Sequence, residues 1–343
     1  MKEIDIFQVD AFTDKVFGGN PAGVVPDATG LGEGQMKSIA REMNCSETAF
    51  VTPPSEAGKG RKPAPDLRVR FFTPTDEVDL CGHATIGTFF LMAAEGRLPS
   101  GRPEPRLAET AGGTVAGEKV AVEKVVQETK AGDLPVYIYR HGPAVERVMM
   151  AQANPRILDE YDGARLAELA GLLGADVADL TATSPTGRPA VPQVVTTGLP
   201  DLILPVRDLE RLKALRPNFA ALGDWCRERR LISVHAFCFG GLEAGATVHG
   251  RDFAPSVGIP EESATGTANG ALGAYLVLNR LIPLSTTTMI RAEQGHILRR
   301  PSQILVEIDV DPASLEGSGR PDVREVRVGG RARAVLRGKM ATS

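Results

Sequence analysis

The chain has 343 residues, of which 42% are hydrophobic and 24% charged, and its net charge at pH 7 is −4. This is an ordinary globular composition with enough apolar residues for two domain cores. The absence of a basic tract argues against nucleic-acid or membrane-surface partners. No apolar run is long enough to cross a membrane and the N-terminal segment lacks signal-peptide features, so we expect a cytoplasmic location.

The first half begins with strand and helix patterns. Residues 3–12 alternate apolar and polar side chains and predict a half-buried strand, which a Gly-Gly-Asn-Pro loop containing Asn20 follows. Residues 35–43 predict a short amphipathic helix. Glu47 stands between this helix and the next strand, a position typical of catalytic groups. Residues 67–72 resume the sheet, and residues 107–122 predict further short strands.

A helix entrance occurs twice. Gly82 and His83 open an apolar run, 82–92, that predicts a buried helix, and residues 265–276 repeat the pattern with Gly266 in place of Gly82. Upstream of each entrance stands an Arg-x-Phe-x-Pro motif, beginning at Arg70 and at Arg251. A repeat at about half the chain length predicts two similar α/β halves.

The predicted boundary between the halves falls within residues 123–141. We therefore assign residues 1–128 to the N-terminal half and 129–343 to the C-terminal half, with the last predicted strand, 323–328, able to return to the first half. The C-terminal half is predicted to alternate strands and helices, beginning with a strand at 147–152. The helical pattern of residues 209–229 is interrupted at Pro217.

The helix entrances suggest an anion site. A helix N-terminus offers unpaired N–H groups and partial positive charge, so two of them suit a carboxylate or a developing enolate. Gly82 and Gly266 would let a ligand approach the backbone, although tight helix packing explains glycines equally well.

Three side chains near the first entrance are candidates for chemistry. Glu47, followed by an apolar run, suits a partly desolvated base, and a structural cap or salt bridge is the alternative. His83 could hold a substrate group as a neutral ring, or serve structure alone. Cys81, at a helix start, could be a second base. Its counterpart is Thr265, which excludes a two-thiol racemase. The four cysteines show no disulfide or zinc-ligand spacing, so no metal site is predicted.

Five motifs carry a family resemblance along nearly the whole chain: DAFTDKVFGGNPAGVV, CSETAFV, RFFTPTDEVDLCGHAT, RDFAPSVGIPEESATGTANGA and EQGHILRRPS. With these the chain resembles the PhzF-type phenazine-biosynthesis isomerases, whose fold is similar to that of diaminopimelate epimerase. The resemblance implies an α+β fold of two epimerase-like domains, each a curled, mostly antiparallel sheet around a central helix, with the active site in the cleft between them. It also implies a homodimer and no metal or organic cofactor.

The resemblance also implies residue roles. Glu47 would transfer the proton, His83 and Glu262 would hold polar groups of the substrate, and Gly82, Gly266 and Thr267 would bind its carboxylate. Asn20 would also reach the substrate, or else form the turn before a proline. The family usually has Asp and Ser where this chain has Glu262 and Thr267, and these larger side chains leave less room for substrate.

Taken together, we expect a cofactor-independent isomerase or epimerase that moves a proton on a small carboxylated, amino-acid-like metabolite by acid/base catalysis at Glu47. Two alternatives stay open. One is an epimerase or dehydratase that uses Cys81 as one of its bases, and the other is a metabolite-binding protein without activity.

Overall fold

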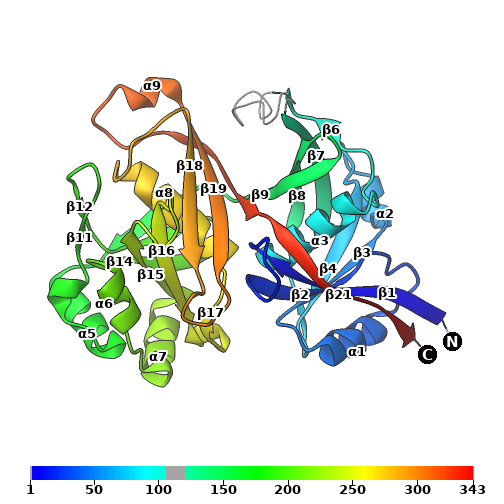
Figure 1. The fold of residues 1–343 in the computed structure, drawn as a ribbon, viewed down its shortest axis with the longest axis horizontal. Helices are drawn as coiled ribbons and strands as arrows, with labels where there is room; N and C mark the ends of the chain where they lie inside the picture. The colour runs from blue at the N-terminus through cyan, green and yellow to red at the C-terminus, as the bar shows by residue number, and fades with distance from the viewer. Residues whose placement is uncertain (1, 106–119, 343) are drawn as a thin grey trace. The chain divides into compact units, whose positions relative to one another are not determined.

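The computed structural model describes residues 2–105 and 120–342, which divide into two compact units (Figure 1). The first unit comprises Met1–Ala151 and Gly329–Ser343, and the second comprises Gln152–Val328. The boundary therefore follows Ala151 and not residue 128. The reason is that β7 (Val120–Thr129), β8 (Gly132–His141) and β9 (Ala144–Ala151) form consecutive antiparallel pairs, and a boundary at residue 128 would separate them.

The first unit is a curled sheet around one helix. Its main strands follow the order β21-β1-β2-β3-β4-β7-β8-β9, in which only the pairs β2–β3 and β4–β7 are parallel. The remaining elements of this unit are β1 (Lys2–Ala11), β2 (Asn20–Val25), α1 (Glu33–Met43), β3 (Thr48–Thr52), α2 (Glu56–Lys59), β4 (Leu67–Phe72), β5 (Glu77–Val78), α3 (Gly82–Ala94), β6 (Arg102–Pro103) and β21 (Ala332–Thr342).

The central helix of this unit is α3, which contacts strands β1, β2, β3, β8, β9 and β21. Its sequence, GHATIGTFFLMAA, is apolar on every face, as expected for a helix enclosed by a sheet. Gly87 allows one strand to approach closely, because a Cβ atom there would lie 3.4 Å from Val9 Cγ1.

The second unit repeats this architecture around α8 (Gly266–Leu278). Its strands follow the order β10-β13-β14-β15-β16-β18-β19-β20, with β14–β15 and β16–β18 parallel. Its other elements are β10 (Arg156–Glu160), α5 (Gly163–Leu173), η1 (Val177–Asp179), β11 (Ala182–Thr183), β12 (Pro189–Ala190), β13 (Gln193–Thr196), β14 (Pro200–Pro205), α6 (Leu209–Ala214), α7 (Phe219–Arg229), β15 (Ser233–Phe239), β16 (Val248–Ala254), η2 (Pro255–Val257), β17 (Ile259–Glu262), β18 (Thr287–Gln294), β19 (Ser302–Val310), α9 (Pro312–Leu315) and β20 (Val323–Gly330).

The two units match element by element. The series β1, β2, β3, β4, β5, α3, β7, β8 corresponds to β13, β14, β15, β16, β17, α8, β18, β19, with the parallel pairs at the same places in both series. Both central helices have 13 residues. The two similar halves predicted from the repeat are confirmed.

The C-terminal segment differs from the prediction. Residues 323–328 form β20 as expected, but they belong to the second unit. The strand that returns to the first unit is β21, which pairs antiparallel with β1 and was not predicted. The predicted strand at 147–152 is β9 of the first unit. Most of the predicted strand segment 107–122 lies outside the described residues.

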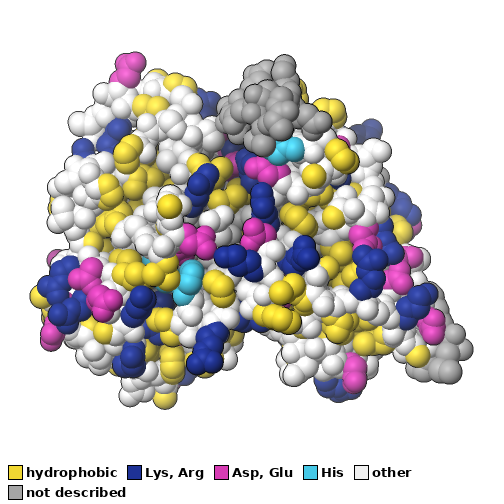
Figure 2. Space-filling model, in the orientation of Figure 1, with side chains coloured by type: hydrophobic (Ala, Val, Ile, Leu, Met, Phe, Trp, Pro, Cys, Tyr) yellow, Lys and Arg dark blue, Asp and Glu magenta, His cyan; other side chains and the backbone are white. Residues whose placement is uncertain are grey.

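The surface carries mixed charge. On the face that Figure 2 shows, acidic and basic side chains are interspersed on each unit, in keeping with the small net charge. Among the described residues, no helix combines the length and apolarity needed to span a membrane.

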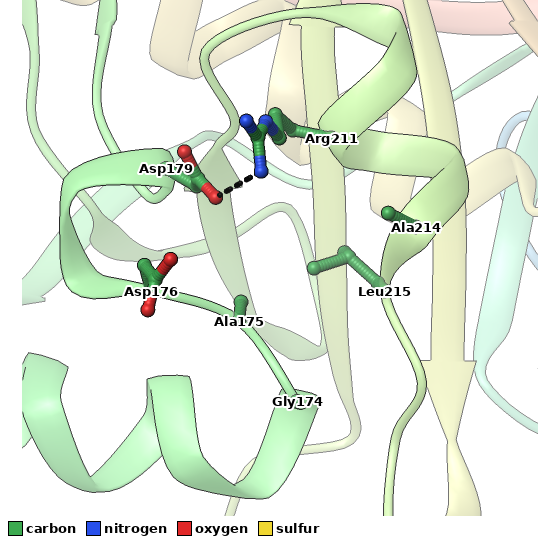
Figure 3. Close-up of a pocket in the computed structure, with 7 residues that line it drawn as sticks. All are labelled: Gly174, Ala175, Asp176, Asp179, Arg211, Ala214 and Leu215. Atoms are coloured by element: carbon green, nitrogen blue, oxygen red, sulfur yellow. Dashed lines mark ion pairs between the residues drawn. The ribbon is translucent and has the colours of Figure 1, made fainter.

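A surface pocket of the second unit lies where α5, η1 and α6 meet (Figure 3). Its lining residues are Gly174, Ala175, Asp176, Asp179, Arg211, Ala214 and Leu215. Arg211 Nη1 lies 3.4 Å from Asp179 Oδ2, and Arg207 pairs with the same carboxylate. The pocket contains none of the residues predicted to act in catalysis, and we assign it no role.

Candidate active site

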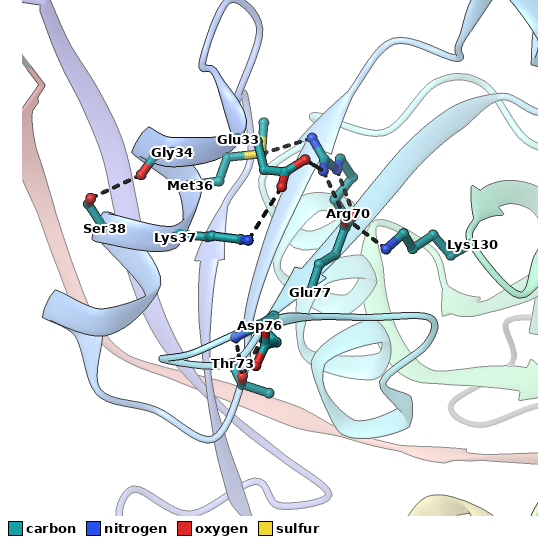
Figure 4. A network of polar contacts seen from close by, with 10 residues as sticks. All are labelled: Glu33, Gly34, Met36, Lys37, Ser38, Arg70, Thr73, Asp76, Glu77 and Lys130. Carbon is teal, nitrogen blue, oxygen red and sulfur yellow. Dashed lines mark hydrogen bonds and ion pairs between the residues drawn. The ribbon is translucent and has the colours of Figure 1, made fainter.

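Each helix entrance is fixed by an arginine clamp, which we define as an arginine of the Arg-x-Phe-x-Pro motif bound to a downstream glutamate. In the first unit Arg70 Nε and Nη2 donate to the two Glu77 oxygens at 2.7 and 2.8 Å (Figure 4). The Arg70 guanidinium carbon also lies 5.0 Å from the centre of the Phe72 ring. The clamp joins β4 to β5, the short strand that leads into α3.

The second clamp has the same geometry. Arg251 Nε and Nη2 donate to the Glu261 oxygens at 2.9 and 2.8 Å, and its guanidinium carbon is 4.8 Å from the centre of the Phe253 ring. The Glu261 carboxylate binds Arg251, and the same ion pair in both units accounts for the repeated arginine of the motif.

Glu47, Cys81 and His83 meet at the entrance of α3. Glu47 directly precedes β3, and its carbonyl oxygen accepts a hydrogen bond from the Gly23 N–H at 3.0 Å. Its Oε2 lies 3.3 Å from His83 Nε2. Ser46 Oγ is 3.3 Å from the same nitrogen, and Cys81 Sγ is 3.5 Å from Nδ1 and 3.9 Å from Nε2. His83 thus contacts both the carboxylate and the thiol.

One oxygen of Glu47 has no hydrogen-bond partner among the described residues. This is Oε2, which is buried although the side chain as a whole is 17% exposed. His83 Nε2 lies 3.3 Å from this oxygen without forming a hydrogen bond to it, and the same nitrogen contacts Ser46 Oγ. A buried carboxylate oxygen without a partner is costly, so this atom is available to receive a proton or a substrate group.

Gly82, the first residue of α3, is not required by protein packing. Among the described residues, a Cβ atom there would find only Met150 Cε within 4 Å, at 3.9 Å, and the φ of Gly82 is not in the left-handed region. The first turn of α3 contains no acidic residue that would occupy its N–H groups. Close approach of a ligand to this backbone is therefore a better explanation of the glycine than tight packing.

His83 is held in its neutral form. Burial lowers the pKa of its ring, and the negative charge of Glu47 offsets this only in part. The direction agrees with the neutral ring expected at a helix N-terminus, but burial is the largest cause. At pH 7 the ring therefore offers one donor and one acceptor nitrogen.

This pKa shift makes stability depend on pH. The unfolded chain binds a proton at His83 below about pH 6.5, whereas the folded chain resists it, so unfolding becomes easier as the pH falls from that value toward the folded pKa. We expect His83→Gln to remove this contribution, which is at most about 1.4 kcal/mol per pH unit for one proton. Thermal melts followed by circular dichroism at pH 7.5 and 5.5 check it. If the difference in melting temperature between wild type and variant is the same at both pH values, the lowered pKa of His83 is contradicted.

The entrance of α8 is organised by a polar network of its own. Thr265 Oγ1 donates to Asp252 Oδ2 at 2.9 Å, and Gln294 Oε1 accepts from the Thr265 N–H at 3.3 Å and from Asn269 Nδ2 at 2.8 Å. Gln294 Nε2 in turn donates to the Glu262 carbonyl at 2.9 Å. The Thr265 hydroxyl therefore serves to fix the helix entrance, consistent with its exclusion as a base.

The remaining predicted residues lie at strand and helix ends. Asn20 is 3% exposed and begins β2, the strand that contains Gly23. In the second unit the half-buried Glu262 ends β17, while Gly266 and the half-buried Thr267 begin α8. The structure thus brings together Glu47, Cys81 and His83. That these three residues share one site with Glu262, Gly266 and Thr267 of the second unit stays a prediction.

Sequence reasoning missed the roles of Ser46, Asp252 and Gln294. All three lie inside quoted motifs, Ser46 in CSETAFV, Asp252 in RDFAPSVGIPEESATGTANGA and Gln294 in EQGHILRRPS, so the motifs marked them without giving a function. The ligand atoms of Glu47, Cys81 and His83 lie within 4.8 Å of one another, so these side chains could also hold a metal ion.

A family model described as phenazine biosynthesis-like protein, PhzC-PhzF, matches residues 9–338. The chain belongs to this family. This PhzC-PhzF member is 31% identical over 341 residues to an uncharacterized isomerase of Clostridium acetobutylicum, with 99% of each chain covered. It is 29% identical over 331 residues to the trans-2,3-dihydro-3-hydroxyanthranilate isomerase of Pseudomonas aeruginosa, covering 96% of this chain and 97% of that one.

A solved structure supports the fold. The crystal structure of the PhzF-family phenazine biosynthesis protein of Bacillus anthracis is 29% identical, covers 100% of both chains and has a TM-score of 0.78. The expected α+β fold of two diaminopimelate epimerase-like domains is confirmed. This PhzC-PhzF chain is an enzyme of the isomerase class, which makes a metabolite-binding protein without activity the weaker interpretation.

Proposed function

We propose that this isomerase moves a proton between two positions of a small carboxylated, amino-acid-like metabolite, with Glu47 as the acid/base. Glu47 would take the proton from a carbon acidified by a neighbouring carboxylate or double bond and return it to another carbon, so substrate and product have the same composition. The N–H groups at the start of α3 would stabilise the negative charge that develops. No metal or organic cofactor takes part in this scheme.

The observation that carries the proposal is the buried, unpartnered Oε2 of Glu47 beside a neutral His83. A general base must present a free lone pair in a place from which water is partly excluded. We propose the following residues for substrate binding: Asn20, Gly82, His83, Glu262, Gly266 and Thr267.

The substrate class follows from the chemistry of the site and of a relative. Helix N-terminal N–H groups suit a carboxylate, and the substrate named for the Pseudomonas aeruginosa relative is an aminated ring carboxylate. We propose the class and not that compound, because Glu262 and Thr267 are bulkier than the Asp and Ser usual in the family.

The test is exchange of carbon-bound hydrogen with solvent. We expect the protein, incubated in D2O with a panel of small amino and unsaturated carboxylates, to incorporate deuterium into at least one of them at carbon, as mass spectrometry would show. A compound that raises the melting temperature but exchanges no hydrogen would count against proton transfer and in favour of binding alone.

A second candidate mechanism uses Cys81 as the other base, and the 3.5 Å approach of its sulfur to His83 favours it. Loss of an acid/base group costs about 10²- to 10⁴-fold in rate. If Glu47 acts alone, the rate of product formation by Cys81→Ala stays within about 10-fold of the wild-type rate. This decrease is much smaller than the decrease expected when an acid/base group is lost. If the thiol is the second base, the variant loses product formation but keeps deuterium exchange on the Glu47 side. Cys226→Ala, which removes a fully buried thiol of the second unit, is the control.

A further inference from the structure

A second group of potential ligands lies in the second unit, apart from the chemistry assigned to Glu47. Among the described residues, two groups of three side chains bring their ligand atoms within 4.8 Å of one another, and one of them consists of His249, Glu293 and His296. His249 lies in β16, Glu293 in β18, and His296 on the turn after β18. The His249 and His296 ring centres are 5.0 Å apart.

The hydrogen bonds of Glu293 determine which nitrogen of His249 carries the hydrogen. Glu293 Oε2 accepts from the Leu242 N–H at 2.7 Å, and Oε1 accepts from the Glu243 N–H at 2.6 Å. With two backbone N–H donors directed at them, both oxygens of Glu293 act as hydrogen-bond acceptors.

His249 must then be the donor in its contact with Glu293. Its Nδ1 lies 2.8 Å from Glu293 Oε2, so Nδ1 carries the hydrogen. With the hydrogen on Nδ1, the lone pair of the neutral ring lies on Nε2. A carboxylate that fixes the tautomer of a histidine in this way is the usual second layer of a metal-binding histidine.

His296 contributes a buried nitrogen without a partner. Its Nδ1 is shielded from solvent and has no hydrogen-bond partner among the described residues, although the residue as a whole is half-buried. The position of the turn is set by Gly295, where a Cβ atom would come within 2.4 Å of the Arg300 and Ser263 carbonyl oxygens. An unpaired nitrogen held in place beside the His249 ring is unfavourable unless something binds it.

We propose that His249 and His296 bind a divalent transition-metal ion, with zinc as the natural candidate, and that Glu293 orients His249 as a positioning residue. Imidazole nitrogens suit zinc, copper and nickel, and water would complete the coordination. Glu293 also holds the loop at Leu242 and Glu243, so the ion would link that loop to the turn at His296. The turn at His296 follows Gln294, the residue that fixes the entrance of α8. Binding of the metal ion therefore stabilises this entrance.

Zinc titration of the full-length chain, after chelator treatment and removal of the chelator, tests the proposal. We expect Cys81→Ser, which weakens the other group of potential ligands, to retain one bound zinc. His296→Ala should weaken zinc binding at least about 10-fold, the lower end of the loss seen when a metal site is disturbed. His249→Gln is the second variant, and circular dichroism checks that both fold. His141→Ala is the matched control, since His141 also pairs with a glutamate, Glu146, but in the first unit.

A cobalt titration separates the two groups of ligands. Cobalt bound at His249 and His296 shows no thiolate-to-metal charge-transfer absorption, whereas cobalt bound at Cys81 does. Zinc should raise the melting temperature of Cys81→Ser, and not that of the double variant Cys81→Ser/His296→Ala. Equal zinc affinity in Cys81→Ser and in the double variant, or a cobalt spectrum that consists only of the thiolate band and disappears in Cys81→Ser, would overturn the proposal.

Discussion

Replacing Glu47 with Gln is expected to lower the rate of substrate-dependent deuterium exchange by about 10²- to 10⁴-fold. Glutamine keeps the size of the side chain and its hydrogen-bonding ability but cannot take up a proton at neutral pH. The measurement is exchange into the best compound of the panel, followed by mass spectrometry at saturating substrate. Because the buried Oε2 has no hydrogen-bond partner among the described residues, the variant loses no hydrogen bond seen at that atom.

Two controls separate catalysis from stability. Glu42→Gln makes the same chemical change at an exposed position of α1 in the same unit, and it should exchange at the wild-type rate. The melting temperature of Glu47→Gln should stay close to that of wild type. Exchange by Glu47→Gln at the full rate would remove this residue from the mechanism and leave Cys81 as the candidate base.

Much of the architecture was predictable because a repeat at about half the chain length carries the same local signals twice. The arginine motif, the glycine at each helix entrance and the apolar central helix each depend on short stretches of sequence, and together they predicted two similar halves. The strand β21 was not predictable in the same way. It pairs with β1, which lies at the other end of the sequence. Its exposed apolar side chains, such as the 48% exposed Leu336, also obscure the alternation of apolar and polar residues that marks a strand.

The candidate site was predictable to a similar extent. Glu47, Cys81 and His83 stood in motifs, and the structure brings them together through the neutral ring of His83. The clamp role of Arg251 and the contact between His249 and Glu293 could not be predicted, because each joins different strands. Such contacts depend on strand register, to which residue spacing along the chain gives no direct clue.

The second large effect is expected for Arg251→Ala, which should destabilise the second unit by about 3–5 kcal/mol, the usual cost of removing one member of a buried ion pair. The Arg251 and Glu261 side chains are 6% and 10% exposed, so the variant would leave the Glu261 carboxylate poorly solvated and without its cation. Arg251 Nη1 also donates to the Leu212 and Leu215 carbonyls at 3.0 Å each, and these acceptors at the end of α6 would lose their donor.

The measurement can be confined to one unit. The chain has a single tryptophan, Trp225, which is buried in α7 of the second unit, so its fluorescence during urea unfolding reports that unit. Arg70→Ala removes the equivalent clamp of the first unit and should leave the Trp225 transition in place while lowering the stability of the first unit by less, because the Arg70 side chain is 17% exposed. If Arg251→Ala and wild type unfold at the same urea concentration by Trp225 fluorescence, the clamp does not stabilise the unit, and its repetition requires another explanation.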